Sequence, residues 1–287
     1  MANLKEIRTR IASVTSTKQI TSAMKMVAAA KLRKAQNTIT KLSPYSQKMA
    51  GVLALLSETL AEDADNVFTS QKPIKKMLAV AISSNKGLCG GFNSYVYKSA
   101  VELHDDCKSK NIDVKFYTIG KKISEGLEKR GFDIYKTNND VIDKADYQSA
   151  ENVANELTSL YVNGDFDCIK IIYNKFVNAA VQRVEQCNFL PLSFSVEKSK
   201  FKTDYIFEPD KNTIVSKLIP QWLKTLFYQT IADSAAGEQG ARMTAMSKAT
   251  DNATELIKEL NLSYNKVRQA SITNEIIEIV SGASAAK

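Results

Sequence analysis

The sequence holds little of the side-chain chemistry on which enzymes depend. It has a single histidine, His104, and four cysteines, none of which stands in a C-x-x-C pair. The usual zinc site needs several Cys or His ligands at close spacing, and nucleophilic catalysis of the Ser–His–Asp or Cys–His type needs a histidine base in a recognisable setting. These absences argue against a zinc protein and a hydrolase, and the cysteines are expected to be reduced thiols.

Long apolar runs are missing as well. No window approaches the roughly 18–20 consecutive apolar residues that a membrane-spanning helix needs. The opening segment MANLKEIRTRIASVTSTKQI has basic residues but no apolar core, so it does not resemble a secretory signal. Because it runs into a helical pattern without a break, we interpret it as part of the folded structure.

Acidic residues are nearly absent from the start of the chain. The net charge is +8, and the first fifty residues hold ten Lys and Arg but one acid, Glu6. The remaining residues are close to neutral overall. This arm therefore predicts an acidic partner, which would be nucleic acid, anionic lipid or an acidic protein surface.

Helix-breaking residues are scarce in the same region. Between Leu4 and Leu60 the only glycine is Gly51 and the only proline is Pro44. From Ala28 onward, apolar residues recur at spacings of three and four, which is typical of a coiled-coil seam. We predict one helix about 85 Å long, with a kink or local break at Pro44.

The end of the chain supplies a partner for this helix. A helical pattern returns from about Lys211 to Ser281, weakened at Gly237 and Gly240, with Gly282 as a predicted C-terminal cap. Residues 1–60 and 208–287 are therefore predicted to form an antiparallel two-helix coiled coil. If both arms enter the middle domain together, the numbers of facing residues sum to about 270.

This register leaves the residues after Val267 without a partner in the same chain. They would form a single helix about 25–30 Å long. Its apolar side chains predict an exposed interaction surface, and they are Ile276, Ile277, Ile279 and Val280. A segment that folds back, or a different register, remains an alternative.

The middle of the chain, residues 74–207, has a different pattern. Strand-like runs at 76–83, 114–120, 167–174 and 181–190, with a further candidate at 204–208, alternate with helical patterns at 94–110, 121–129 and 147–162. Such alternation predicts a mostly parallel sheet with helices on both faces. No helix separates the last two long strands, so an antiparallel edge is expected. The fold class is thus a Rossmann-like α/β domain of about five strands, inserted between two long helices.

The first strand runs into a glycine-rich segment, SSNKGLCGGFN, at residues 83–93. It has neither the G-x-G-x-x-G spacing of dinucleotide folds nor the GxxxxGK[ST] of P-loops, and Lys86 precedes the glycines. A structural turn is favoured, with Asn93–Ser94 as an ordinary helix N-cap. A nucleotide-dependent enzyme remains the alternative interpretation of this segment.

Several segments together resemble the γ subunit of F-type ATP synthases. They are KEIRTRIASVTSTKQITSAMKMVAAAKLRKAQ, GLCGGFN, DYIFEPD, ARMTAMSKATDNA and NKVRQASITNEIIEIVSGA. One departure is Asn85–Lys86, where the family commonly has Asp-Arg. The resemblance implies a non-catalytic rotor without cofactors, whose coiled coil turns inside a ring of α and β subunits. Its α/β domain would form a foot, together with the ε subunit, on the ring of c subunits.

The resemblance also implies roles for individual residues. Contact with the β subunits, and coupling, would involve Met24, Lys25, Arg242, Arg268, Gln269, Thr273 and Glu275. The apolar end of the last helix would sit in a hydrophobic bearing. Contacts of the foot with the c ring or ε would involve Lys86, Tyr205 and Glu208. By residue type alone, each would be a seam or solvated helix position.

The resemblance further implies one copy per complex, no nucleic acid, and membrane contact only through the c ring. The location would be the cytoplasmic face of the bacterial inner membrane. A basic coiled-coil protein that binds nucleic acid is the rival interpretation. However, no Phe, Trp or Tyr precedes Tyr45, so the basic arm offers no aromatic platform for stacking bases.

Overall fold

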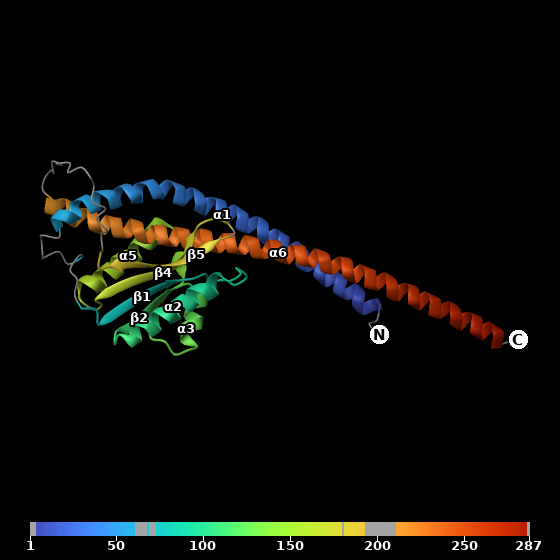
Figure 1. Ribbon diagram of the computed structural model, residues 1–287. Helices are drawn as coiled ribbons and strands as arrows, with labels where there is room; N and C mark the ends of the chain where they lie inside the picture. Colours follow the sequence, from blue (N-terminus) through green and yellow to red (C-terminus); the bar gives the residue numbers. More distant parts are fainter. Residues whose placement is uncertain (1–3, 61–67, 69–72, 180, 193–210, 286–287) are drawn as a thin grey trace. The chain divides into compact units, whose positions relative to one another are not determined.

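The computed structural model describes residues 4–60, 68, 73–179, 181–192 and 211–285 (Figure 1). The chain divides into two compact units. The arm unit comprises Met1–Ala28 and Met243–Lys287, and the sheet unit comprises Ala29–Arg242. Two long helices, α1 (Leu4–Leu60) and α6 (Lys211–Ala285), each contribute to both units.

The two long helices begin and run as the apolar spacing predicts, but α1 has no break at Pro44 and α6 does not end at Gly282. A kink at Pro44 stays a prediction. Helix α1 is continuous through Pro44. Proline has no N–H, so the carbonyl one turn earlier loses its helical hydrogen bond, and because Pro44 is exposed, water can bind that carbonyl instead. Packing on the following turns offsets the cost, because Ser46, Met49 and Leu53 are buried. Gly282 lies inside α6 and is no cap, since one glycine costs a helix only about 1 kcal/mol.

The sheet unit is built on five strands, of which the sequence predicts four. They are β1 (Lys76–Ile82), β2 (Asp113–Ile119), β3 (Ile134–Asn138), β4 (Cys168–Phe176) and β5 (Gln182–Leu190). Their order is β3-β2-β1-β4-β5, and all neighbours are parallel except β4 and β5. The predicted parallel sheet with an antiparallel edge is confirmed, whereas the candidate strand at 204–208 lies outside the described residues.

Helices cover both faces of this sheet, as predicted. On one face, α2 (Phe92–Ser109) and α3 (Lys121–Glu128) pack on side chains such as Ala79, Phe116 and Ile172. On the other face lie α5 (Tyr147–Val162) and the first part of α6 (Figure 1). The short α4 (Asp140–Lys144) packs in the same hydrophobic cluster. The short α4 and the edge strand β3 are absent from the sequence prediction.

Helix α6 is buried against the sheet as well as against α1, which the seam pattern did not reveal. Four of its fully buried apolar residues recur every four positions, and they are Ile219, Leu223, Phe227 and Ile231. The same cluster includes Leu53 of α1. Further along α6, a side chain at Gly240 would meet the backbone oxygen of Ala179 at 3.1 Å. This glycine therefore lets α6 come close to the connection between β4 and β5.

In the arm unit, the first part of α1 and the last part of α6 run antiparallel. The hydroxyl oxygens of Thr21 and Thr250 lie 2.8 Å apart and share a hydrogen bond. Lys25 Nζ donates to Ser247 Oγ at 3.0 Å, and Arg8 Nη2 donates to the Tyr264 hydroxyl at 2.8 Å. The residue numbers of these pairs sum to 271 or 272, in agreement with the predicted register of about 270.

Candidate functional site

The predicted contact residues Met24 and Lys25 lie on α1 beside an exposed apolar strip. Lys25 is exposed although its ammonium group donates to Ser247, and Met24 is half-buried. The neighbouring Ile20 and Val27 are 60% and 57% exposed. This surface therefore combines a positive charge with apolar contact area, which suits a partner that is both acidic and apolar.

The second group of predicted contact residues lies on the last turns of α6, and all four are exposed: Arg268, Gln269, Thr273 and Glu275. The hydrogen bonds of this group run within α6. Thr273 Oγ1 donates to the Gln269 carbonyl at 2.9 Å, and Ser271 Oγ donates to Glu275 Oε1 at 3.4 Å. These side chains are therefore available to a partner without disturbing the fold.

The predicted apolar tip is also exposed. In the arm unit, the end of α6 extends past the start of α1 (Figure 1). The exposed fractions are 55% for Ile276, 56% for Ile277, 70% for Ile279 and 62% for Val280. Four large apolar side chains in water on one helical turn mark a contact surface. The described part of this segment continues as helix to Ala285 and does not fold back.

Arg242 has a different setting, at the end of the sheet unit. Its guanidinium is mostly buried, and Nη1 donates to Glu238 Oε1 at 2.6 Å. Nη2 donates to the carbonyl oxygens of Lys86 and Gly87, at 3.2 and 3.3 Å. Burial raises the pKa of the Glu238 carboxyl, and the neighbouring Arg242 charge partly offsets this effect. The arginine thus joins α6 to the glycine-rich turn.

The turn is further ordered by its own side chains. Asn93 Oδ1 accepts from the Ser84 amide at 3.0 Å and from Ser84 Oγ at 2.9 Å. Asn85 Nδ2 donates to the Asn139 carbonyl and to Asp143 Oδ2, which fastens the turn to α4. Asn93 is therefore not the predicted N-cap; α2 begins at Phe92 with Gly91 in the capping position.

These bonds have the wrong polarity for a nucleotide. A phosphate at a strand-to-helix turn is held by N–H donors, as in the dinucleotide and P-loop folds. Here the turn instead presents acceptors: the carbonyl oxygens of Lys86 and Gly87 accept hydrogen bonds from the cationic Arg242 of α6. The structure accordingly supports a structural turn and gives no support to a nucleotide-dependent enzyme.

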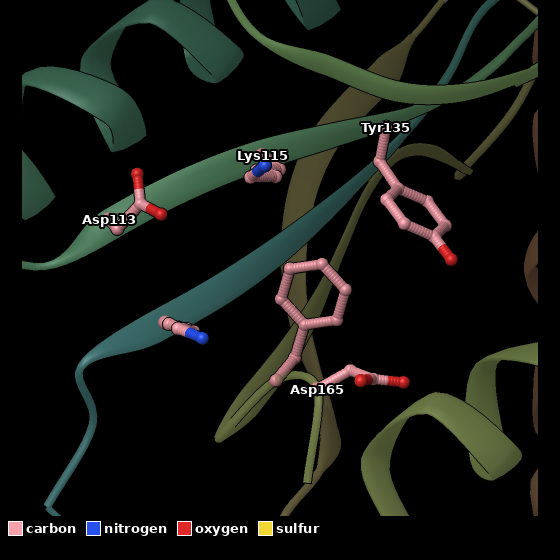
Figure 2. Close-up of a pocket in the computed structure, with 6 residues that line it drawn as sticks. Asp113, Lys115, Tyr135 and Asp165 are labelled. Carbon is pink, nitrogen blue, oxygen red and sulfur yellow. The ribbon is translucent and has the colours of Figure 1, made fainter. Parts of the chain in front are cut away.

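A pocket of about 300 Å³ opens at the opposite, amino-terminal edge of the sheet (Figure 2). Lysines and aspartates line it in equal number, with an aromatic pair, Tyr135 and Phe166, in T-shaped contact at 5.6 Å. Ligands of open α/β sheets bind at the carboxyl ends of the strands. This pocket is at the other end, and sequence reasoning selected none of its residues.

The structure thus regroups the predicted site residues. Lys86 and Arg242, assigned by resemblance to different partners, lie together in the sheet unit through the Lys86 carbonyl. Sequence reasoning missed Glu238, although its spacing of four from Arg242 on a predicted helix was an available signal. Tyr205 and Glu208 lie outside the described residues. In the described part of the chain, no group of acidic, Cys or His side chains could hold a metal ion.

Two long antiparallel helices that enclose an α/β insertion define the class to which this chain belongs. A family model described as ATP synthase matches residues 3–286. The ATP synthase gamma chain of Christiangramia forsetii is 52% identical over 287 residues, covering 99% of both chains. That of Flavobacterium psychrophilum is 53% identical over 288 residues, covering 100% of both. The chain belongs to the ATP synthase gamma chain family.

Solved structures of distant relatives share this fold. A chain of the Euglena gracilis mitochondrial ATP synthase, from the assembly of OSCP, F1 and c ring, has a TM-score of 0.69 at 21% identity and covers 98% of this chain. A chain of the Euglena gracilis rotor has a TM-score of 0.64 at 19% identity, with 94% of this chain and 98% of that one covered. These similarities confirm the fold class.

Proposed function

We propose that this chain is the central-stalk rotor subunit of a proton-translocating F-type ATP synthase and has no catalytic site of its own. The full-length relationship to ATP synthase gamma chains carries the proposal. It is supported by the fold shared with a chain of a solved ATP synthase rotor. In the glycine-rich turn, the Lys86 carbonyl accepts from Arg242 and the Ser84 amide donates to Asn93, so these groups are bonded within the protein. This agrees with a subunit that works without binding a nucleotide.

In this proposal, the arm unit stands inside the ring formed by three α and three β subunits. Rotation of an asymmetric shaft favours open or closed states of each β subunit in turn, so coupling requires contact and no reactive side chain. The coupling contacts would be Met24, Lys25, Arg268, Gln269, Thr273 and Glu275, with Arg242 at the start of the shaft. The apolar end of α6 would turn in a hydrophobic bearing.

The sheet unit would form the foot that the membrane sector turns. It would contact the ε subunit and the ring of c subunits, with Lys86, Tyr205 and Glu208 as the proposed contacts. Membrane contact would occur only through the c ring, at the cytoplasmic face of the bacterial inner membrane, with one copy per complex. In the described part of the chain, none of the helices combines the length and apolar character of a membrane span.

The uneven charge of the chain fits this arrangement. A basic arm would meet acidic loops of the β subunits, and Lys25, which is exposed, would be one of these contacts. The rival interpretation, nucleic-acid binding, would use the same basic residues, but neither the family relationship nor the solved relatives support it. Steep salt-dependent binding to DNA at physiological ionic strength would favour the rival.

Co-expression with the α and β subunits of the same organism tests the proposal. We expect a stable complex with ATPase activity that contains this chain, and loss of that complex when the gene for the chain is omitted. A variant with the exposed Lys98 replaced, Lys98→Ala on α2 of the sheet unit, serves as a control that should assemble normally. Failure to isolate an ATPase containing the chain would contradict the proposal.

A further inference from the structure

The ion pair of Glu238 and Arg242 is placed to restrain the glycine-rich turn. Both side chains are 11% exposed, and they lie one helical turn apart on α6. A guanidinium removed from water needs partners for its five donors. Glu238 accepts from Nη1, which leaves Nη2 directed at the Lys86 and Gly87 carbonyls of the turn.

The backbone of the turn is held in a conformation that requires support. Leu88, directly after these two carbonyls, has a φ of 63°, in the left-handed region that a leucine rarely adopts. Its side chain is 65% exposed, so packing of Leu88 itself does not hold the turn. Strained backbone persists only where its surroundings determine it, and here those surroundings include Arg242.

We propose that Glu238 and Arg242 form a latch that holds the turn, residues 83–93, on α6, and that Arg242 acts on coupling through the position of this turn. Glu238 is a positioning residue, because its carboxylate orients the guanidinium toward the two carbonyls. The part of this inference that concerns coupling rests on the proposed function. The part that concerns the latch rests on the contacts alone.

Cys89 provides a reporter inside the turn. It is 2% exposed, and its sulfur accepts from Asn93 Nδ2 at 3.3 Å. Burial raises the pKa of the Cys89 thiol, the Glu238 charge raises it further, and the Arg242 charge acts in the opposite direction. Loss of that charge would by itself lower the thiolate fraction and slow alkylation. Arg242→Lys keeps a positive charge, so faster alkylation in this variant reports opening of the turn. In Glu238→Gln, loss of the carboxylate charge would by itself speed alkylation, so Arg242→Lys is the deciding variant.

The same chain contains internal controls. Cys107 and Cys168 are buried in the cluster between the sheet, α2 and α3, and Cys107 Sγ donates to Met77 Sδ of β1 at 3.7 Å. General loosening of the sheet unit would expose all three thiols. Opening of the turn would expose Cys89 alone.

The experiment uses the full chain in its complex with α and β subunits, and compares it with Arg242→Lys and Glu238→Gln. Alkylation by N-ethylmaleimide is followed for each cysteine by mass spectrometry. We expect the rate at Cys89 to rise about tenfold in both variants, because a charged hydrogen-bonded contact is lost, while Cys107 and Cys168 keep their rates. An unchanged rate at Cys89, or an equal rise at all three, would overturn the latch.

A second readout tests the role in coupling. In the membrane-reconstituted enzyme, both variants should pump fewer protons per ATP hydrolysed than the parent. The exchange Glu238→Arg with Arg242→Glu restores an ion pair on α6 but moves the guanidinium one turn away from the carbonyls, so it should restore neither coupling nor protection of Cys89. Normal coupling in the exchanged enzyme, or in either single variant with an open turn, would refute this role.

If no ATPase complex forms, the proposed function fails, and alkylation of the full chain alone still decides the latch.

Discussion

At the residue scale, Gly120 shows how the end of a strand can require glycine. It follows β2 with a φ of 99°, and a side chain there would meet the Ser83 carbonyl oxygen at 2.2 Å. Two separate effects therefore exclude other residues, the backbone conformation and the lack of space. Gly131 has a similar φ of 73° but open space around it.

The pair of glycines allows these effects to be separated. We expect Gly131→Ala to lower the free energy of unfolding by about 1–2 kcal/mol, the cost of the left-handed conformation. Gly120→Ala should cost about 4 kcal/mol or more, because the backbone of β1 or β2 must also shift. Urea denaturation followed by circular dichroism measures both. If both variants lose the same free energy of unfolding, the clash of the new side chain at position 120 with the Ser83 carbonyl costs nothing measurable.

Asp233 of α6 is a carboxyl group in an unfavourable position. It is 5% exposed, and burial raises its pKa from 3.8 to about 6; the charge of Lys175 lowers it and that of Glu185 raises it further. The folded state therefore binds the proton more tightly than the unfolded chain does. The stability gained from this proton is present below pH 4 and is lost as the pH rises through 6.

Replacement of this carboxyl should be stabilising at neutral pH. We expect Asp233→Asn to raise the free energy of unfolding at pH 7.5 by about 2–3 kcal/mol and to flatten its decline between pH 4 and 6. A remaining slope of the same sign is expected from Glu238, whose pKa burial also raises. Urea denaturation across this range measures the effect, with the exposed Asp106→Asn as control. A parent protein more stable than the variant at pH 7.5 would contradict it.

At the scale of elements, α6 illustrates one helix with two environments. Between Lys211 and Arg242 it packs on the sheet, where Leu223 is fully buried; in the arm unit, Leu262 is 72% exposed. The two leucines share residue type and helix but differ in burial. Leu223→Ala should lower the free energy of unfolding by about 2–5 kcal/mol, and Leu262→Ala should change it by less than about 0.5 kcal/mol.

Thermal and urea denaturation of both variants measure this difference. A large effect of Leu262→Ala in the isolated chain would mean that the end of the arm packs against something in that chain. A small effect of Leu223→Ala would mean that α6 is not part of the core of the sheet unit.

The elements also differ in how well local sequence predicts them. Four strands are predicted within about two residues of their observed limits, because each presents a continuous buried or alternating pattern. Strand β3 exposes its three central side chains and pairs only with β2, so its sequence has no such pattern. Helix α4 has five residues, too few for a helical period to be visible.

At the scale of the whole molecule, the exposed end of α6 carries the prediction most closely tied to function. Gln269→Leu combined with Thr273→Val changes two exposed side chains, and the Thr273 hydroxyl donates to the Gln269 backbone carbonyl of the same helix. In the assembled enzyme we expect weaker coupling between ATP hydrolysis and proton pumping. The chain's own stability should change by less than about 0.5 kcal/mol, as for exposed positions in general.

The matched control is Asn261→Leu with Asn265→Val, which alters exposed residues at the same spacing on the same helix. Coupling should be retained in this control. Proton pumping in reconstituted vesicles and denaturation of the isolated chain are the two measurements. Unfolding of the Gln269 and Thr273 variant would assign these side chains to a core, and normal pumping would remove them from the coupling contacts.

The sequence alone determined the long helices and the parallel sheet, because apolar spacing and the scarcity of breakers are local properties. It predicted the antiparallel register and the exposed apolar end, with alternatives that only the structure decided. Only the tertiary structure decided that α1 continues through Pro44, that α6 packs on the sheet, and that Arg242 meets the Lys86 and Gly87 carbonyls. These outcomes depend on residues up to 156 positions apart in the chain. Burial and hydrogen bonding between such distant groups outweigh local preference, and no local pattern records them.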